Sequence, residues 1–221
     1  MQRILSSFIV GLLIILPCNG EEILFQDNFK EGLSKKWEIV GLDKQDYRVK
    51  DGGFEMRVQS NPKERGMLNV TLPFKRSDTV IASVNVTLLN EFTADKEYAA
   101  LALTTDGSVE FLAKQQRVDG KLVFSPGQYI FKGKKGEEGD VNKYEIKYTA
   151  ATPEAGDLRI IVRDHYAFFQ VGPSTKMGYS TFFHSAIQKN NTKNGFCLTA
   201  HGAPDKASHW VRFTDFKVVK N

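Results

Sequence analysis

Apolar and polar residues alternate with a period of two along most of this chain, a pattern that predicts β-strands with one face turned toward a core. The clearest examples are 67–73, 79–89 and 144–148. No segment sustains the i, i+3, i+4, i+7 apolar spacing of an amphipathic helix, and the best place for a short helix is 174–190. The pattern therefore predicts an all-β chain.

Short turns that contain Asp and Gly separate the predicted strands. Residues 51–53 (Asp-Gly-Gly) lie between the apolar segments 47–49 and 54–58, which is the pattern of a β-hairpin. Similar turns are expected at 106–107, 119–120 and 163–165. About a dozen short strands without a long linker or a fixed-period repeat predict one domain, either a two-sheet antiparallel sandwich or a barrel.

The first twenty residues have the features of a secretory signal peptide. Arg3 precedes an uninterrupted apolar run over 8–16, and residues 17–20 follow it as a cleavage region. We expect cleavage after Gly20, which leaves a secreted, extracellular domain over 21–221. The apolar stretch is shorter than the roughly 20 residues that span a bilayer, so no stable membrane insertion is expected. A lipid anchor on Cys18 is the alternative, but Pro17 fits such sites poorly.

Composition and charge are those of a soluble globular protein. The chain has 41% hydrophobic and 25% charged residues, and removal of Arg3 lowers its net charge from +4 to +3. This small positive excess is spread along the chain and forms no basic patch. We therefore expect no nucleic acid partner.

Three N-x-[ST] sequons, at Asn69, Asn85 and Asn190, predict N-glycosylation if the source is eukaryotic. Asn69 and Asn85 lie on the polar side of alternating strands, and Asn85 is opposite Val84 and Val86. Both side chains are therefore expected to point away from the core, where a glycan could be attached.

Three short motifs lie near the two ends of the predicted domain. The domain begins with residues 25–29 (FQDNF) and Trp37. The second motif is the segment 47–54, and the third is the segment 211–218 at the end of the domain. These motifs resemble the F-x-D-x-F entry, the first hairpin and the closing F-D-N-F-x-V strand of secreted concanavalin A-like domains of the laminin-G and glucanase type. The resemblance implies a jelly-roll β-sandwich, a fold that hosts lectins, hydrolases, lyases and adhesion modules.

The sequence lacks the motifs of several catalytic and metal-binding classes. The E-x-D-x-x-E pattern, by which glucanases of this fold place acids on one strand face, is absent. Glu55, Glu110 and Glu145 each stand alone in an alternating strand, where we expect solvated carboxylates that point outward. The four histidines lack zinc-binding spacing and no calcium-loop motif occurs, so we predict no metal and no cofactor. A calcium ion held by separate loops is the alternative.

Cys197 is the only cysteine of the predicted mature chain. It lies in a strand-like apolar segment, where a small, packed side chain is expected. An intermolecular disulfide is the alternative.

The densest polar and aromatic cluster lies near the end of the chain, at His201, Asp205, His209 and Trp210. A sugar ring has apolar C–H faces that stack on an indole, and its hydroxyls form hydrogen bonds with groups such as imidazole and carboxylate. We therefore predict that these four residues bind a ligand. The alternative is that Trp210 packs at the start of the last strand.

Three functions are consistent with these observations. The first is a secreted, lectin-like protein that binds a carbohydrate or glycoprotein, and the missing acid pair favours it over an enzyme. The second is an extracellular glycoside hydrolase or lyase of the same fold. The third is an adhesion or structural protein whose partner is another protein.

Overall fold

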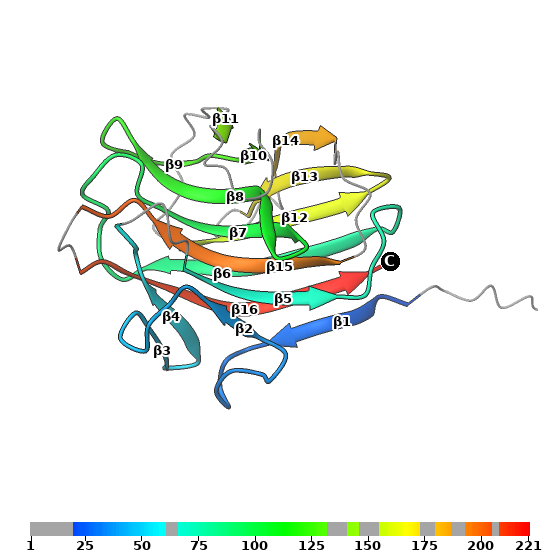
Figure 1. Cartoon of the computed structure of the whole chain (residues 1–221), viewed down its shortest axis with the longest axis horizontal. Helices are drawn as coiled ribbons and strands as arrows, with labels where there is room; N and C mark the ends of the chain where they lie inside the picture. Colours follow the sequence, from blue (N-terminus) through cyan, green and yellow to red (C-terminus); the bar gives the residue numbers. More distant parts are fainter. Residues whose placement is uncertain are drawn as a thin grey trace, which may run out of the picture.

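The computed structural model describes residues 20–60, 66–131, 141–145, 155–172, 180–186, 193–204 and 208–221 (Figure 1). Every regular element within these ranges is a β-strand, which confirms the all-β prediction. None of the described residues forms a helix long and apolar enough to cross a membrane. The predicted signal peptide, apart from Gly20, and the predicted sites at Asn190 and Asp205 lie outside the described residues.

The strands form two antiparallel sheets, so the predicted two-sheet sandwich is confirmed. The first sheet has the order β14 (Ser180–Ala186), β13 (Tyr166–Val171), β12 (Ala155–Arg163), β6 (Val80–Leu88), β16 (Trp210–Lys220), β4 (Gly53–Arg57) and β3 (Tyr47–Lys50), and β1 (Glu22–Asp27) also pairs with β16. The second sheet has the order β11 (Val141–Glu145), β10 (Gly127–Phe131), β8 (Ser108–Val118), β7 (Tyr98–Thr105), β15 (Asn194–His201), β5 (Met67–Leu72) and β2 (Glu38–Val40), and β9 (Lys121–Phe124) also pairs with β8. Figure 1 shows both layers with most strands running across the view.

The main core lies between the two sheets and follows the alternation of the sequence. In β6, Val80, Ala82, Val84 and Val86 are buried in this core, whereas the residues between them are only half-buried. The second sheet differs because its outer face is buried as well. The apolar side chains on that face form a separate buried cluster of Met67, Tyr98, Ala100, Ala102, Val109, Leu112 and Cys197. Strands buried on both faces have nearly continuous apolar sequences, as β7 does.

The turns predicted from Asp and Gly are tight hairpins. Two consecutive residues with positive φ occur at 51–52, 106–107, 119–120 and 164–165. Two positive φ values are typical of type I′ turns, whose twist matches that of the flanking strands. The first three turns place Gly at the second position, but the fourth has His165, at φ 65°.

The segment 174–190 was the best candidate for a short helix. This expectation is wrong where the structure describes the segment, because residues 180–186 form the strand β14. This strand pairs with β13, from Tyr166↔Ala186 to Val171↔Ser180. The unpaired backbone groups of β13 are satisfied by a neighbouring strand, and this pairing overrides a weak local preference for helix.

The FQDNF motif has a structural role at the end of β1. The Asp27 carboxylate accepts hydrogen bonds from the backbone N–H of Phe29 (2.7 Å), the backbone N–H of Ser34 (3.0 Å) and Trp37 Nε1 (2.8 Å). The Trp37 ring then packs against Phe25 and Phe216, with ring centres 5.2 and 4.8 Å apart. One buried carboxylate thus holds the loop over the end of the core.

Candidate functional site

The structure places the predicted ligand-binding residues in three different environments. His201 is 4% exposed at the end of β15, on the outer face of the second sheet, where its ring packs against Tyr98. His209 precedes β16, and its Nδ1 lies 2.9 Å from Glu97 Oε1. Trp210 begins β16 on the outer face of the first sheet. His201 and Trp210, nine positions apart in the sequence, therefore lie on opposite sides of the sandwich.

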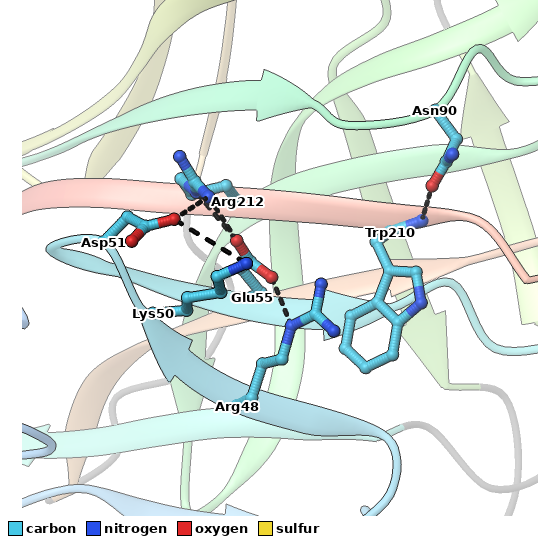
Figure 2. Close-up of polar contacts among 7 residues, drawn as sticks. All are labelled: Arg48, Lys50, Asp51, Glu55, Asn90, Trp210 and Arg212. Atoms are coloured by element: carbon cyan, nitrogen blue, oxygen red, sulfur yellow. Dashed lines mark hydrogen bonds and ion pairs between the residues drawn. The ribbon is translucent and has the colours of Figure 1, made fainter.

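Trp210 is partly exposed and flanked by two arginines. Its position pairs with Arg57 of β4, whose guanidinium carbon lies 5.3 Å from the centre of the indole ring. The guanidinium carbon of Arg48, in β3, lies 4.4 Å from the same ring (Figure 2). The Trp210 backbone N–H donates to Asn90 Oδ1 at 2.9 Å, which fixes the start of the strand. Guanidinium groups at such distances are attracted to the π-face of an indole.

Glu55 of β4 organises the arginines next to this ring. It is 1% exposed and accepts hydrogen bonds from Arg48 Nε (2.5 Å), Arg212 Nε (2.9 Å) and Arg212 Nη2 (2.5 Å). Burial alone would raise the pKa of Glu55, but the hydrogen bonds from Arg212 and Arg48, with their positive charges, hold that pKa below its ordinary value. Glu55 is therefore a fixed anion that orients two guanidinium groups.

We name this surface the Trp210 face, formed by Arg48, Glu55, Arg57, Trp210 and Arg212 on the outer side of β3, β4 and β16. The side chains of Arg48, Arg57 and Arg212 are 49%, 36% and 25% exposed. The face therefore presents an indole ring and guanidinium N–H groups to solvent, with its carboxylate beneath them.

A second group of polar residues lies on the outer face of the second sheet. Lys114 Nζ lies 5.2 Å from the centre of the Tyr98 ring and donates to Gln116 Oε1 at 2.9 Å. With His201 these residues place a lysine, a histidine and a tyrosine on neighbouring strands. Lys114 and Gln116 are at most 1% exposed. This Lys114 cluster is buried, in contrast to the Trp210 face.

Lys114 and Gln116 were not singled out from the sequence, because a single Lys or Gln in a strand is normally solvated. Alternation places both on one face of β8, and the register Ala100↔Lys114 and Tyr98↔Gln116 places them beside Tyr98. Arg48 and Arg57 were also missed, because they lie more than a hundred residues from Trp210 in the sequence. Only strand pairing brings them next to Trp210.

The expectation of solvated carboxylates is wrong for Glu55 and Glu110. Both are buried, and Glu110 accepts hydrogen bonds from Arg76 Nη2 (2.8 Å) and Thr105 Oγ1 (2.7 Å). Glu97, also buried, accepts the backbone N–H of Thr93 at 2.7 Å, besides its contact with His209. These carboxylates already form hydrogen bonds or ion pairs within the protein, which suits them to stabilise the fold. The side chain of Glu145 lies outside the described residues.

The sequon side chains are less accessible than expected. Asn69 is on the side of β5 away from the main core, as predicted, but it is 3% exposed and accepts a hydrogen bond from Thr104 Oγ1 at 3.1 Å. The expected exposure of Asn69 is therefore wrong, because that face of the second sheet is itself covered. Asn85 is half-buried, and its Nδ2 donates to Asp157 Oδ1 at 2.8 Å.

Among the described residues, no group of three or more His, Cys, Asp or Glu side chains could hold a metal ion. Cys197 is fully buried, as expected of a packed side chain.

Two hollows lie in the described part of the chain, and none of the residues of the Trp210 face lines either of them. One, of about 570 Å³, adjoins the loop after β1, where the oxygens of Asp27 are already bonded. The other, of about 250 Å³, is lined by Leu89, Phe92 and Arg117, and the backbone N–H of Leu89 donates to the Trp210 carbonyl oxygen at 2.9 Å. The exposed side chains of the Trp210 face lie across three strands, outside both hollows.

Comparison with known proteins shows a shared fold. No family model matches the chain, and no curated protein matches it in sequence. A xylan β-1,4-xylosidase from Bacillus halodurans is similar in structure, with a TM-score of 0.68, 10% identity, and coverage of 89% of this chain and 39% of the other. Bacteroides ovatus Xyloglucan PUL GH43B gives a TM-score of 0.64 and 12% identity, covering 87% and 38%. The CBM2 module of the Lactobacillus casei phage J-1 evolved Dit gives 0.64 and 12%, covering 90% and 95%.

The chain thus spans less than two fifths of the two glycoside-active proteins but nearly all of the phage module. At these identities the comparisons show the β-sandwich fold alone.

Proposed function

We propose that this protein is a secreted, lectin-like protein that binds carbohydrate on the Trp210 face. The observation that carries the proposal is a partly exposed indole flanked by two solvent-accessible guanidinium groups. The part of the indole that Arg48 and Arg57 leave exposed offers an apolar surface to the C–H face of a pyranose, and the guanidinium N–H groups offer donors to its oxygens.

The structural neighbours support a carbohydrate ligand. Two are named for xylan or xyloglucan systems, and the phage module is named as a CBM2 module. The open shape of the Trp210 face suits an extended glycan that lies across β3, β4 and β16. A concanavalin A-like relationship, as implied by the sequence motifs, is part of the proposal.

Accessibility favours the Trp210 face over the Lys114 cluster. The arginines of the Trp210 face are 25–49% exposed, whereas Lys114 is fully buried. A polysaccharide can approach the first surface without any rearrangement of the strands.

Binding is favoured over hydrolysis by the state of the carboxylates. Glycoside hydrolysis uses two carboxyl groups across the scissile bond, and the general acid needs a raised pKa. Glu55, the buried carboxylate of the Trp210 face, has its pKa lowered by two arginines and cannot serve as that acid near neutral pH. A glycoside hydrolase or lyase remains the competing function, and release of new sugar ends from a bound polysaccharide would support it.

Secretion is part of the same proposal. It rests on the apolar run over 8–16 and on the residues after it. N-terminal sequencing of the protein exported by its host should find Glu21 as the first residue, and retention of the full chain inside the cell would contradict this.

The experiment that tests carbohydrate binding is affinity electrophoresis of wild type and Trp210→Ala in gels that contain a panel of polysaccharides. Loss of a stacking contact worth about 1.4 kcal/mol should weaken binding about tenfold. Tyr166→Ala is the matched control, because Tyr166 is an exposed aromatic residue (44%) near the opposite end of the first sheet. Retardation by no polysaccharide, or equal retardation of both variants and wild type, would contradict the proposal.

A further inference from the structure

We infer that the carbohydrate bound by the Trp210 face is acidic, with a carboxylate or sulfate group that accepts hydrogen bonds from Arg48 and Arg57. This inference rests on the proposed function and names its ligand class.

Arg48 keeps hydrogen-bonding capacity that a ligand can use. Its Nε donates to Glu55, and the described part of the chain provides no partner for Nη1 and Nη2. Figure 2 shows its guanidinium group beside the Trp210 indole, with Glu55 on the other side. Since the side chain is 49% exposed, both Nη groups are accessible to a ligand that lies against the ring.

Arg57 supplies a second cation at the same ring. Its Nε lies 3.8 Å from Asp46 Oδ1, which is an ion pair beyond hydrogen-bond distance. Both guanidinium carbons lie within 5.3 Å of the indole centre, so one sugar residue on this face can reach both.

The chemical type of the free groups decides the ligand class. A neutral sugar hydroxyl both donates and accepts, and sites for neutral sugars offer both kinds of partner. Here the buried acceptor, Glu55, already accepts three hydrogen bonds from Arg48 and Arg212, whereas N–H donors of Arg48 remain available. A surface that offers mainly hydrogen-bond donors suits ligand groups that only accept hydrogen bonds. Guanidinium groups bind carboxylate and sulfate-like oxyanions with particular strength.

The arrangement of charge points the same way. The Trp210 face and its border carry four cationic side chains, namely Arg48, Lys50, Arg57 and Arg212, against the three carboxylates of Asp46, Asp51 and Glu55. Glu55 and Asp46 are only 1% and 15% exposed, whereas Arg48 and Lys50 are 49% and 58% exposed. Asp51, at the border beside Lys50, is the one well-exposed carboxylate of this set, at 63%. The exposed charges next to the Trp210 ring, those of Arg48 and Arg57, are therefore positive.

Matched pairs of polysaccharides test the inference, because they share a backbone and differ in charge. Polygalacturonate is compared with its fully methyl-esterified form, and carrageenan with its chemically desulfated form, so that carboxylate and sulfate are separate arms. We expect the acidic member of at least one pair to bind about tenfold or more tightly than its neutral partner, with affinity that falls as salt is added.

Variants with equal loss of charge show whether the arginines of this face are responsible. Arg57→Gln should weaken binding of the acidic member, whereas Arg163→Gln should leave it unchanged. Arg163 is exposed at the Val80 end of β6, and Trp210 lies near the Leu88 end, about 27 Å away along the strand. Arg57 is used because it does not bond to Glu55, and Arg48→Lys provides a second variant that keeps the charge but loses the fork of donors.

The outcomes separate the inference from the function on which it rests. Equal binding of both members of every retained pair, or equal effects of Arg57→Gln and Arg163→Gln, overturns the acidic ligand and leaves carbohydrate binding intact. Retention of no polysaccharide by a folded sample overturns both.

Discussion

At Glu55, burial and charge act in opposite directions on one carboxyl group. Burial in β4 favours the neutral form, but Arg48 and Arg212 favour the ionised form and prevail, so the pKa lies below its ordinary value of 4.5. A group whose pKa is lower in the folded state adds stability above its unfolded pKa and loses it as pH falls through the folded pKa. Glu55 should therefore stabilise the fold at neutral pH and cease to do so in acid.

The substitution Glu55→Gln tests this. Near neutral pH it should lower the free energy of unfolding by about 1.5–3 kcal/mol, because charged hydrogen bonds are replaced by weaker ones. The difference from wild type should shrink as the pH falls below the ordinary value of 4.5 and through the lower pKa of Glu55 in the folded state, where the wild-type carboxyl becomes protonated. Urea titrations across this pH range provide the measurement.

Asp164→Asn is a suitable control for that series, because Asp164 is 74% exposed and pairs only with Arg163 at the surface among the described residues. It should change stability little at any pH. A penalty for Glu55→Gln that is the same in acid as at neutral pH would contradict the role given to the ionised carboxylate.

Single residues also show the limit of reasoning from alternation. The sequence predicted correctly that Asn69 and Glu55 point away from the main core. It could not predict that both would be buried, because burial of an outward position depends on what lies over that face. For Glu55 the covering groups include Arg48 and Arg212, and Arg212 is 157 residues away.

At the scale of the strands, local signals were more informative. The Asp-Gly turns predicted the hairpins because a type I′ turn needs two residues with positive φ, a requirement that lies within the turn itself. The strand β8 spans 108–118, and its register against β7 shifts between Leu103 and Thr104. A bulge of this kind depends on the partner strand, so the single sequence did not reveal it.

Gly202, after β15, makes an element-scale prediction. It has φ +93°, and a Cβ there would lie 2.3 Å from the carbonyl oxygen of Lys96. Gly202→Ala should therefore lower the free energy of unfolding by about 2 kcal/mol or more, since it combines backbone strain with a clash between two chain segments. Thermal and urea unfolding of the purified variant measure this.

Gly107→Ala separates the two contributions. Gly107 also has positive φ, at +76°, but a Cβ there would meet nothing within 4 Å. Gly107→Ala should lower the free energy of unfolding by only about 1 kcal/mol, because it adds backbone strain without a clash. Equal losses in both variants would show that the close approach at Lys96 does not constrain the fold.

At the scale of the whole molecule, the sandwich creates the candidate site by bringing distant strands together. Trp210 was identified from sequence because it stands among polar residues. Arg48 and Arg57 were not, since their place beside Trp210 follows from the pairing of β16 with β4 and of β4 with β3. His201 and Trp210, which seemed to form one site, were separated because β15 and β16 belong to different sheets.

The two tryptophans of the chain allow a direct test of ligand binding at the Trp210 face. Each indole N–H gives one signal in a ¹H–¹⁵N correlation spectrum. Trp37 is 9% exposed and its Nε1 donates to Asp27, whereas Trp210 is partly exposed between Arg48 and Arg57. The variant Trp210→Ala assigns the two signals.

The spectrum is recorded while oligosaccharides cut from the retained polysaccharide are added. The Trp210 indole signal should shift progressively and saturate, while the Trp37 signal should stay in place. A saturating ligand that leaves the Trp210 signal unmoved, or that moves only the Trp37 signal, would contradict carbohydrate binding on the Trp210 face.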